Sequence, residues 1–243
     1  DISRPFRAPH HTASKVSIIG GGSKALPGEI SLAHNGVLFL DEMPEFPKSI
    51  LESLRQPLED RKITITRTNR KSSYPANFML IATMNPCPCG FYGDAAKECT
   101  CSSTQILNYQ RKLSGPLMDR IDMVVNVDRI HNKNLLSKNN NKNSEHANAK
   151  KQIEMSLELQ HKRYDCSNLY NSMVKTNDVK NKFNISKEAE DLLNLATSKL
   201  DLSARAFIKI LKVSRTIADL DSSKDIKVNH ISEALQYRHK NEN

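Results

Sequence analysis

Two adjacent carboxylates follow a short apolar run in the first quarter of the chain. The run is Val37-Leu38-Phe39-Leu40, and Asp41 and Glu42 come directly after it. Four consecutive apolar residues favour a strand buried on both faces, as in a parallel sheet. Ligands of such sheets bind at the carboxyl ends of the strands. There, one carboxylate can hold Mg²⁺ through its water shell, and the other can orient a water that attacks a phosphate. The alternative is a strand that ends in two solvated acids.

Two further segments offer groups for the same chemistry. The apolar run over residues 77–85 predicts a second buried strand, and Asn85 at its end can hydrogen-bond an attacking water or a terminal phosphate. A third strand is expected over Asp122–Val127. Arg120, just before it, is a candidate for stabilising charge on a transferring phosphoryl group, because a planar guanidinium suits that role.

Four of the five cysteines lie in one short segment that is rich in Gly and Pro. They form two Cys-x-Cys pairs, Cys87 with Cys89 and Cys99 with Cys101, and nine residues separate the pairs. Four thiolates in a loop without a hydrophobic stripe suit a structural tetrahedral Zn²⁺ site. Four reduced cysteines without metal are the alternative. Cys166 lies outside the group and is interpreted as a bystander.

A basic hairpin is expected between the two apolar runs. Residues 63–67 alternate as a strand does, and a second extended run over residues 72–74 follows the turn. Arg67, Arg70 and Lys71 lie at its tip, where they could meet the phosphates of a nucleic acid. An ordinary solvated turn is the alternative.

Helices are expected around these strands. One begins at Pro27 and stops at Asn35-Gly36. Another begins at Pro47 and carries a single buried stripe on the sheet side; its apolar residues are Ile50, Leu51, Leu54 and Leu58. The segment Arg4–His11 has two prolines and no periodicity, so an irregular basic segment is expected there.

The remainder, from about Glu145, is expected to be helical throughout. Ser186 and Ser203 are predicted helix caps, and a further helix opens at Asn229. Arg205 lies in the first turn of the helix that Ser203 caps. The helix dipole disfavours arginine there, which favours a functional reason for it. Arg215, on the same helix, is expected at the surface.

Composition sets the broad class. A chain of 243 residues with 38% hydrophobic content can bury a sizeable core. Its formal net charge of +9 favours an acidic partner such as nucleic acid or a nucleotide. It has no run of 18 apolar residues and nothing like a signal peptide, and its cysteine number is odd. A cytoplasmic protein that does not enter the membrane is therefore expected.

Several motifs in order resemble the magnesium-chelatase-like AAA+ ATPases of the YifB/ComM type. The first motif is residues 27–42, which end in Leu-Asp-Glu. The second is Asn85-Pro-Cys-Pro-Cys-Gly90, and the third runs from Ser114 to Asp122. The resemblance covers Arg4 to about Arg238. It implies an α/β fold that begins with a partial AAA+ P-loop NTPase core. That core would be a parallel sheet with helices on both faces, and an α-helical lid would follow it. It also implies ATP and Mg²⁺ as cofactors.

The resemblance assigns a role to each candidate. Asp41 and Glu42 would be the Walker B acids, with Asp41 on Mg²⁺, and Asn85 would be sensor 1. Arg120 would be the arginine finger that acts on the neighbouring subunit's ATP, and Arg205 the sensor 2 arginine. Family members form hexameric rings, and the basic hairpin would face the central pore, where DNA is the expected partner.

The chain departs from the family pattern in two respects. The family's phosphate-binding loop, which ends Gly-Lys-Ser/Thr, occurs nowhere in the 243 residues. This chain alone is therefore expected to be inactive, and its sheet to lack the strand that precedes that loop. Residues 131–143 read as an Asn/Lys-rich insertion. The expected division is a core fragment over 1–130, the insertion over 131–144 and a lid over 145–243.

The function expected from the resemblance is ATP hydrolysis that drives DNA remodelling, such as branch migration in recombination or natural transformation. Two other classes stay open. One is a chelatase-type motor subunit that inserts Mg²⁺ into a porphyrin, against which the basic hairpin counts. The other is a catalytically inactive remnant, which the missing phosphate loop favours.

Overall fold

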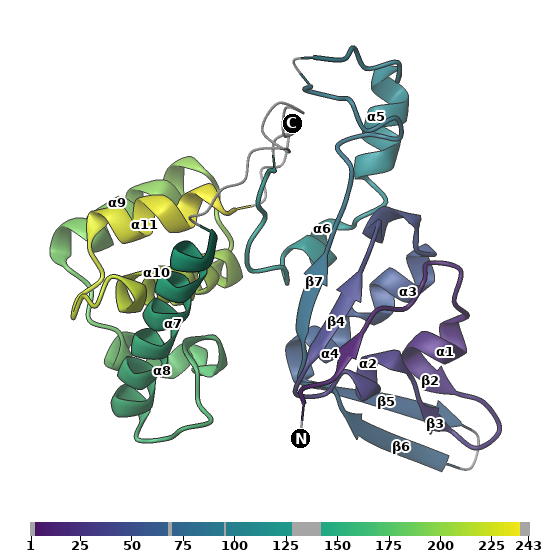
Figure 1. Ribbon diagram of the computed structural model, residues 1–243, viewed down its shortest axis with the longest axis horizontal. Helices are drawn as coiled ribbons and strands as arrows, with labels where there is room; N and C mark the ends of the chain where they lie inside the picture. Colours follow the sequence, from purple (N-terminus) through teal and green to yellow (C-terminus); the bar gives the residue numbers. More distant parts are fainter. Residues whose placement is uncertain (1–2, 68–69, 95, 128–141, 239–243) are drawn as a thin grey trace. The chain divides into compact units, whose positions relative to one another are not determined.

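The computed structural model describes residues 3–67, 70–94, 96–127 and 142–238 (Figure 1). The chain divides into two compact units, Asp1–Arg120 and Ile121–Asn243, each of which is described by itself. The first unit is α/β and the second is helical. No helix in the described ranges has the length and apolar composition that a membrane span requires. The predicted insertion over 131–144 falls largely outside the described residues.

The first unit is built on three parallel strands in the spatial order β1-β4-β7. They are β1 (Phe6–Arg7), β4 (Val37–Leu40) and β7 (Met79–Ala82). Two antiparallel hairpins accompany them, β2 (Gly20–Gly21) with β3 (Leu26–Pro27) and β5 (Lys62–Arg67) with β6 (Arg70–Pro75). The helical elements are α1 (Lys15–Ile19), α2 (Glu29–Leu32), η1 (Met43–Glu45), α3 (Lys48–Ser53), α4 (Arg55–Asp60), α5 (Ser103–Gln110) and α6 (Gly115–Met118).

Strand β4 is the centre of this sheet. It pairs with β1 on one side and β7 on the other, so the predicted strand before the two acids is confirmed. Leu38 and Leu40 are fully buried, while Val37 and Phe39 are half-buried. The strand therefore buries one face more completely than the other, whereas the sequence predicted equal burial of both.

Strand β7 is shorter and more exposed than the buried strand predicted over 77–85. It has four residues, and Met79 and Ile81 are 63% and 42% exposed. Within the described residues β4 is the one strand to which it is hydrogen-bonded. Apolar side chains on an edge strand lack the cover that a second neighbouring strand and its connecting helix would provide.

The prediction of an irregular segment over Arg4–His11 was wrong for Phe6 and Arg7, which form β1. The Pro5 carbonyl accepts a hydrogen bond from the Val37 backbone N–H at 2.8 Å and starts the pairing. Gly36 permits this contact, because a Cβ at that position would lie 1.9 Å from the Pro5 oxygen. The close approach of one backbone to another gave the segment a strand partner that its local sequence does not reveal.

The helix predicted from Pro47 is present but divided into α3 and α4. Ile50, Leu51 and Leu54 are buried as its stripe predicted. The division falls at Leu54, between the two helices. Pro57 explains it, since proline has no N–H to donate to the carbonyl four residues earlier.

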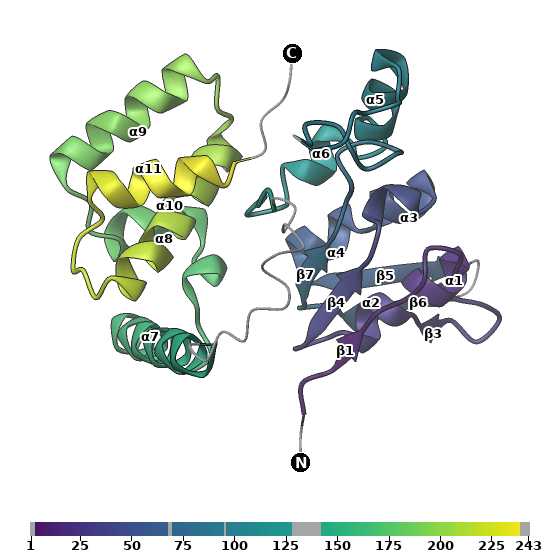
Figure 2. The same ribbon diagram turned by 45° about the horizontal axis from the view of Figure 1, so that its top comes forward.

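The basic hairpin is confirmed as β5 and β6, with Arg67 paired to Arg70 at its tip. It lies beside the β2–β3 hairpin in both views (Figures 1 and 2), where the Tyr74 hydroxyl donates to the Ala25 carbonyl at 2.6 Å. The two residues between the strands lie outside the described ranges.

The third strand predicted over Asp122–Val127 is absent from the described residues. Residues 121–127 have no regular secondary structure, and the Val124 backbone N–H donates to the Tyr237 carbonyl at 2.8 Å. The segment has the β-branched and apolar residues of a strand, but a strand also requires a neighbouring strand to bond with. In the described part of the second unit, the segment meets the end of a helix instead.

The second unit is a bundle of helices. Its elements are α7 (Lys142–Tyr164), η3 (Asn171–Met173), α8 (Thr176–Lys182), α9 (Lys187–Lys199), α10 (Ala204–Leu220) and α11 (Val228–Gln236). Ser186 and Ser203 cap α9 and α10 through their side-chain oxygens, as predicted. One apolar core joins the helices; its fully buried members include Ala189, Leu193, Ala218, Ile226 and Ile231.

The prediction of a surface position for Arg215 was wrong. Its side chain is fully buried and pairs with Asp219 one turn along α10, at 3.0 Å. Asp219 also accepts from Arg163, and Asn171 donates to it at 2.9 Å. Burial lowers the pKa of Arg215 and outweighs the attraction of Asp219. Helical spacing alone predicted that Arg215 lies on the polar face of α10. In the structure, Arg163 of α7 and Asn171 of η3 pack against that face and bond Asp219, so the face is buried.

We predict that Asp219→Asn destabilises the second unit by about 3–5 kcal/mol, because it leaves two guanidinium groups in the interior without a charge partner. Urea denaturation followed by circular dichroism measures the change. The matched control is Asp191→Asn on α9, an exposed position, where a change within about 0.5 kcal/mol is expected. Equal effects of the two substitutions would contradict a structural role for the buried pair.

Candidate functional site

The carboxyl ends of β4 and β7 bring the two acids next to a threonine. Leu40 and Ala82 are paired in the parallel register, so Asp41 and Thr83 are the next residues at the same rim. The Thr83 hydroxyl donates to the Asp41 carboxylate at 2.6 Å, and its oxygen accepts from the Glu42 backbone N–H at 3.0 Å. One side chain therefore fixes the orientation of Asp41 and the position of Glu42.

The backbone around this contact is held by further bonds from the same residue. The Thr83 N–H donates to the Leu40 carbonyl, and the Thr83 carbonyl accepts from Met43 at 2.8 Å. Glu42 has φ 49° and ψ 52°, in the left-handed region that is rare for residues other than glycine. Strained backbone of this kind collects at functional sites, where the surrounding structure imposes it.

The chemistry of the donor set fits a hydrated magnesium ion. Asp41 and Glu42 are both exposed, so their oxygens can be reached from solvent. Hard carboxylate oxygens with room for several waters are the ligands that Mg²⁺ prefers. In this arrangement Asp41, oriented by Thr83, is the residue that would hold the ion.

Asn85 lies two residues beyond Thr83 and is exposed. Its backbone N–H bonds the hydroxyl of Tyr109, a buried residue of α5. Burial raises the pKa of Tyr109 and outweighs that hydrogen bond, and the charges of Glu45 and Glu42 raise it further. Asn85 thus follows the carboxyl end of β7, and a hydrogen bond joins its backbone to α5.

Thr83 is the residue that sequence reasoning missed. It stands inside the apolar run over 77–85 and looks like an ordinary β-branched strand residue. The signal that was available is its register: a polar hydroxyl in the first position after a strand, next to an acid that follows the neighbouring strand.

Arg120 is held inside the first unit. It lies just after α6 and its side chain is 14% exposed. Its guanidinium pairs with Glu59 at 2.5 Å and donates to the carbonyls of Arg55 and Pro116. These bonds join Arg120 to α4 and to α6. Arg120, Arg55 and Glu59 line an open depression beside α4.

The remaining candidates lie on other elements. Arg205 is exposed on the first turn of α10 in the second unit, as its position after Ser203 predicted. Lys71 is exposed on β6, next to the hairpin tip. Arg67 and Arg70 end β5 and begin β6, and their side chains lie outside the description.

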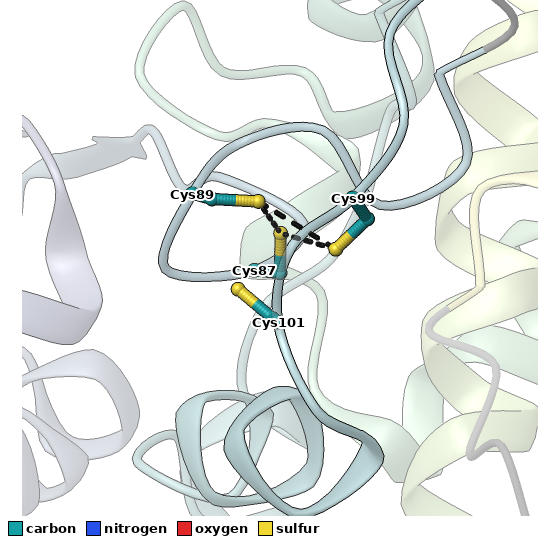
Figure 3. A group of neighbouring side chains, drawn as sticks. All are labelled: Cys87, Cys89, Cys99 and Cys101. Carbon is teal, nitrogen blue, oxygen red and sulfur yellow. Dashed lines mark hydrogen bonds between the residues drawn. The ribbon is translucent and has the colours of Figure 1, made fainter.

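The four loop cysteines converge on one point (Figure 3). The sulfur of Cys87 lies 3.4 Å from that of Cys89 and 3.7 Å from that of Cys99, and Cys89 and Cys99 are 3.5 Å apart. All four sulfurs, including that of Cys101, lie within 4.8 Å of one another. Cys166 belongs to the second unit and is exposed.

Neighbouring cysteines have opposite pKa shifts. The backbone N–H of Phe91 lowers the pKa of Cys89 to about 5. For Cys99 the Cys101 N–H lowers the pKa, but burial and the contacts with Cys89 and Cys87 raise it to about 12. The sulfurs are so close that a thiolate on one favours a proton on the next.

Comparison with known proteins places the chain in a family. Residues 2–135 match the family model for magnesium chelatase, subunit ChlI, and residues 143–238 match that for the ChlI C-terminal region. The chain is 42% identical over 235 residues to the competence protein ComM of Haemophilus influenzae and to the YifB protein of Escherichia coli. It shows a more distant similarity, 23% identity, to the DNA replication licensing factor mcm-6 of Caenorhabditis briggsae.

The family models place the chain among the magnesium-chelatase-like AAA+ proteins. The parallel sheet and the helical unit that follows it agree with that class. Within that class, the chain belongs to the YifB/ComM family. The matches to ComM and YifB cover 97% of this chain and 45% of each relative. The chain thus spans less than half the length of these relatives.

We predict that Thr83→Val speeds hydrogen exchange of the Glu42 amide, because valine keeps the shape of threonine but cannot accept that hydrogen bond. A stability loss of about 0.5–1.5 kcal/mol should accompany it. Exchange measured by NMR tests the first effect, and Thr83→Ser, which retains the hydroxyl, should stay close to the original protein. Unchanged exchange of the Glu42 amide in the valine variant would contradict the clamp, by which we mean the pair of hydrogen bonds that the Thr83 hydroxyl makes with Asp41 and Glu42.

Proposed function

We propose that this chain forms part of a AAA+ ATPase whose hydrolysis of ATP remodels DNA. The observation that carries the proposal is the pair of acids after β4, oriented by Thr83 from β7. Membership of the YifB/ComM family supports the ATPase class. Since the relatives are about twice as long as this chain, the activity is proposed for the full-length protein.

Each residue has a distinct role in this proposal. ATP with Mg²⁺, when bound, supplies a transferable phosphoryl group and a cation that neutralises its charge. Asp41 holds the ion, and Glu42 orients the attacking water and accepts its proton. Asn85 keeps that water in line with the terminal phosphate, because an amide can donate and accept at once. Arg205, the proposed sensor 2, contacts nucleotide from the helical unit.

Arg120 is proposed to act on the nucleotide of a neighbouring subunit in a hexameric ring. Its guanidinium is charged at all physiological pH values and can bind phosphate oxygens in two places at once. In the single chain those donors are occupied by Glu59 and by the carbonyls of Arg55 and Pro116. Contact with a neighbour's phosphates would therefore replace the Glu59 carboxylate with a more highly charged anion.

DNA is proposed as the polymer on which the ring acts. One similar protein is named a competence protein, and a distant one is a DNA replication licensing factor. The chain carries a net charge of +9, and the β5–β6 hairpin presents Arg67, Arg70 and Lys71 close together in sequence at its tip. Clustered cations of this kind bind phosphates without reading the sequence.

In the full-length protein, Glu42→Gln is expected to leave ATP binding within about threefold of the original while lowering the turnover rate at least 100-fold, the scale of a lost acid–base group. Glutamine keeps the size of the side chain but cannot take a proton from water. Binding is measured with a fluorescent ATP analogue and turnover by phosphate release. Glu45→Gln, three residues further on in η1, is the matched control and should keep its turnover. Unchanged hydrolysis in the Glu42 variant would refute its role.

For the hairpin, the triple variant Arg67→Ala, Arg70→Ala and Lys71→Ala should weaken DNA binding at low salt and reduce the salt dependence. Each lost phosphate contact lowers the slope of log K against log salt by about 0.9. A matched control removes three exposed lysines, Lys180, Lys182 and Lys187, from the second unit. Equal salt slopes for the two triple variants would show that net charge, and not the hairpin, binds DNA.

A further inference from the structure

We propose that Cys87, Cys89, Cys99 and Cys101 form a closed tetrahedral site for a structural Zn²⁺ ion. The distances carry the argument. Four sulfurs at about 2.3 Å from a central Zn²⁺ lie about 3.8 Å from one another. Three of the sulfur pairs are 3.4–3.7 Å apart, and all four sulfurs lie within 4.8 Å of each other. Small side-chain movements convert this cluster into a regular tetrahedron.

Disulfide bonding does not account for the cluster. The separations of 3.4 Å and more exceed the sulfur–sulfur bond of about 2.05 Å, and the cysteines are free thiols. A pair of disulfides would also draw the sulfurs together two by two, whereas here Cys87, Cys89 and Cys99 are nearly equidistant. Mutual convergence of four sulfurs is what a single central ion requires.

Backbone amides around the sulfurs favour their thiolate form. The Tyr92 N–H donates to the Cys87 sulfur at 3.3 Å, and the N–H groups of Phe91 and Thr100 bond Cys89. Such donors offset the negative charge that four thiolates bring to one cation, and they hold the ligands in place. Zinc binding then displaces the thiol protons that remain, which pass to solvent.

The number and burial of the ligands indicate a structural ion. Cys87 is fully buried and the other three cysteines are half-buried. Four protein ligands leave no open position for water or substrate, which distinguishes structural from catalytic zinc. Soft thiolates also select Zn²⁺ over Mg²⁺, so this site and the carboxylates after β4 would take different metals.

The loop that carries the cysteines has little else to order it. It joins β7 to α5 (Figure 1), and its described residues include one fully buried side chain, that of Cys87 itself. Gly90 and Gly93 have φ near 80° and lie in two turns, which backbone hydrogen bonds close from Gly90 to Cys87 and from Asp94 to Phe91. The ion would link the start of the loop, two residues after Asn85, to its end, where Ser102 caps α5. It therefore replaces a hydrophobic core that the loop is too small to build.

Metal analysis of the purified 243-residue chain, prepared without chelators, tests the site. About one Zn²⁺ per chain is expected, and the double variant Cys99→Ser and Cys101→Ser should lose at least nine-tenths of it. Cys166→Ser is the matched control and should keep its zinc, because Cys166 is exposed in the second unit. Equal zinc in the double variant and the control, or iron in place of zinc, would overturn the assignment.

Two measurements on the unaltered chain make the test independent of whether the variant folds. After metal removal under reducing conditions, titration with Co²⁺ should saturate near one equivalent and give the intense visible bands of tetrahedral thiolate coordination. A thiol reagent should label Cys166 rapidly in the zinc-loaded chain, and all five cysteines after zinc removal. Absence of Co²⁺ uptake, or rapid labelling of all five cysteines in the zinc-loaded chain, would refute the site.

Discussion

The side chain of Thr83 holds the carboxyl ends of two parallel strands together. It donates to Asp41 and accepts from the Glu42 backbone, while the backbone N–H of the same residue donates to Leu40 and its carbonyl accepts from Met43. Because β4 and β7 are parallel and paired from Val37 to Leu40, the residues that follow them emerge side by side. The left-handed conformation of Glu42 depends on this support, since an unsupported glutamate would relax to a common backbone region.

The segment after β7 links that rim to the rest of the first unit. Within a few residues it contains Thr83, Asn85 and the first cysteine of the cluster, and the Tyr109 hydroxyl bonds the Asn85 backbone from α5. A local change at the cysteines would thus reach Asn85 along the chain from Cys87, and through α5 and the Tyr109 hydrogen bond from Cys101. Polar groups at a strand end need such fixed neighbours, because their positions must hold within fractions of an ångström to orient a reacting water.

The helical unit depends on a different constraint, a buried charge that must be matched. Arg215 is fully buried and its guanidinium is held by Asp219 and by the carbonyls of Ser223 and Lys224. Arg163 and Asn171 complete the shell around Asp219. A buried ion pair contributes little to stability by comparison with apolar packing, but it strongly disfavours arrangements that separate its members. It therefore fixes how α7 and η3 meet α10.

Local sequence determined the strand before Asp41, the β5–β6 hairpin and the caps at Ser186 and Ser203, because apolar runs, alternation and capping oxygens act over a few residues. It also grouped the four cysteines. The tertiary structure alone decided the β1 pairing through Gly36, the clamp by Thr83, the burial of Arg215 and the loss of the strand over 122–127. Each of these depends on a partner distant in sequence, and neither periodicity nor residue type specifies which partner a backbone or a charge will meet.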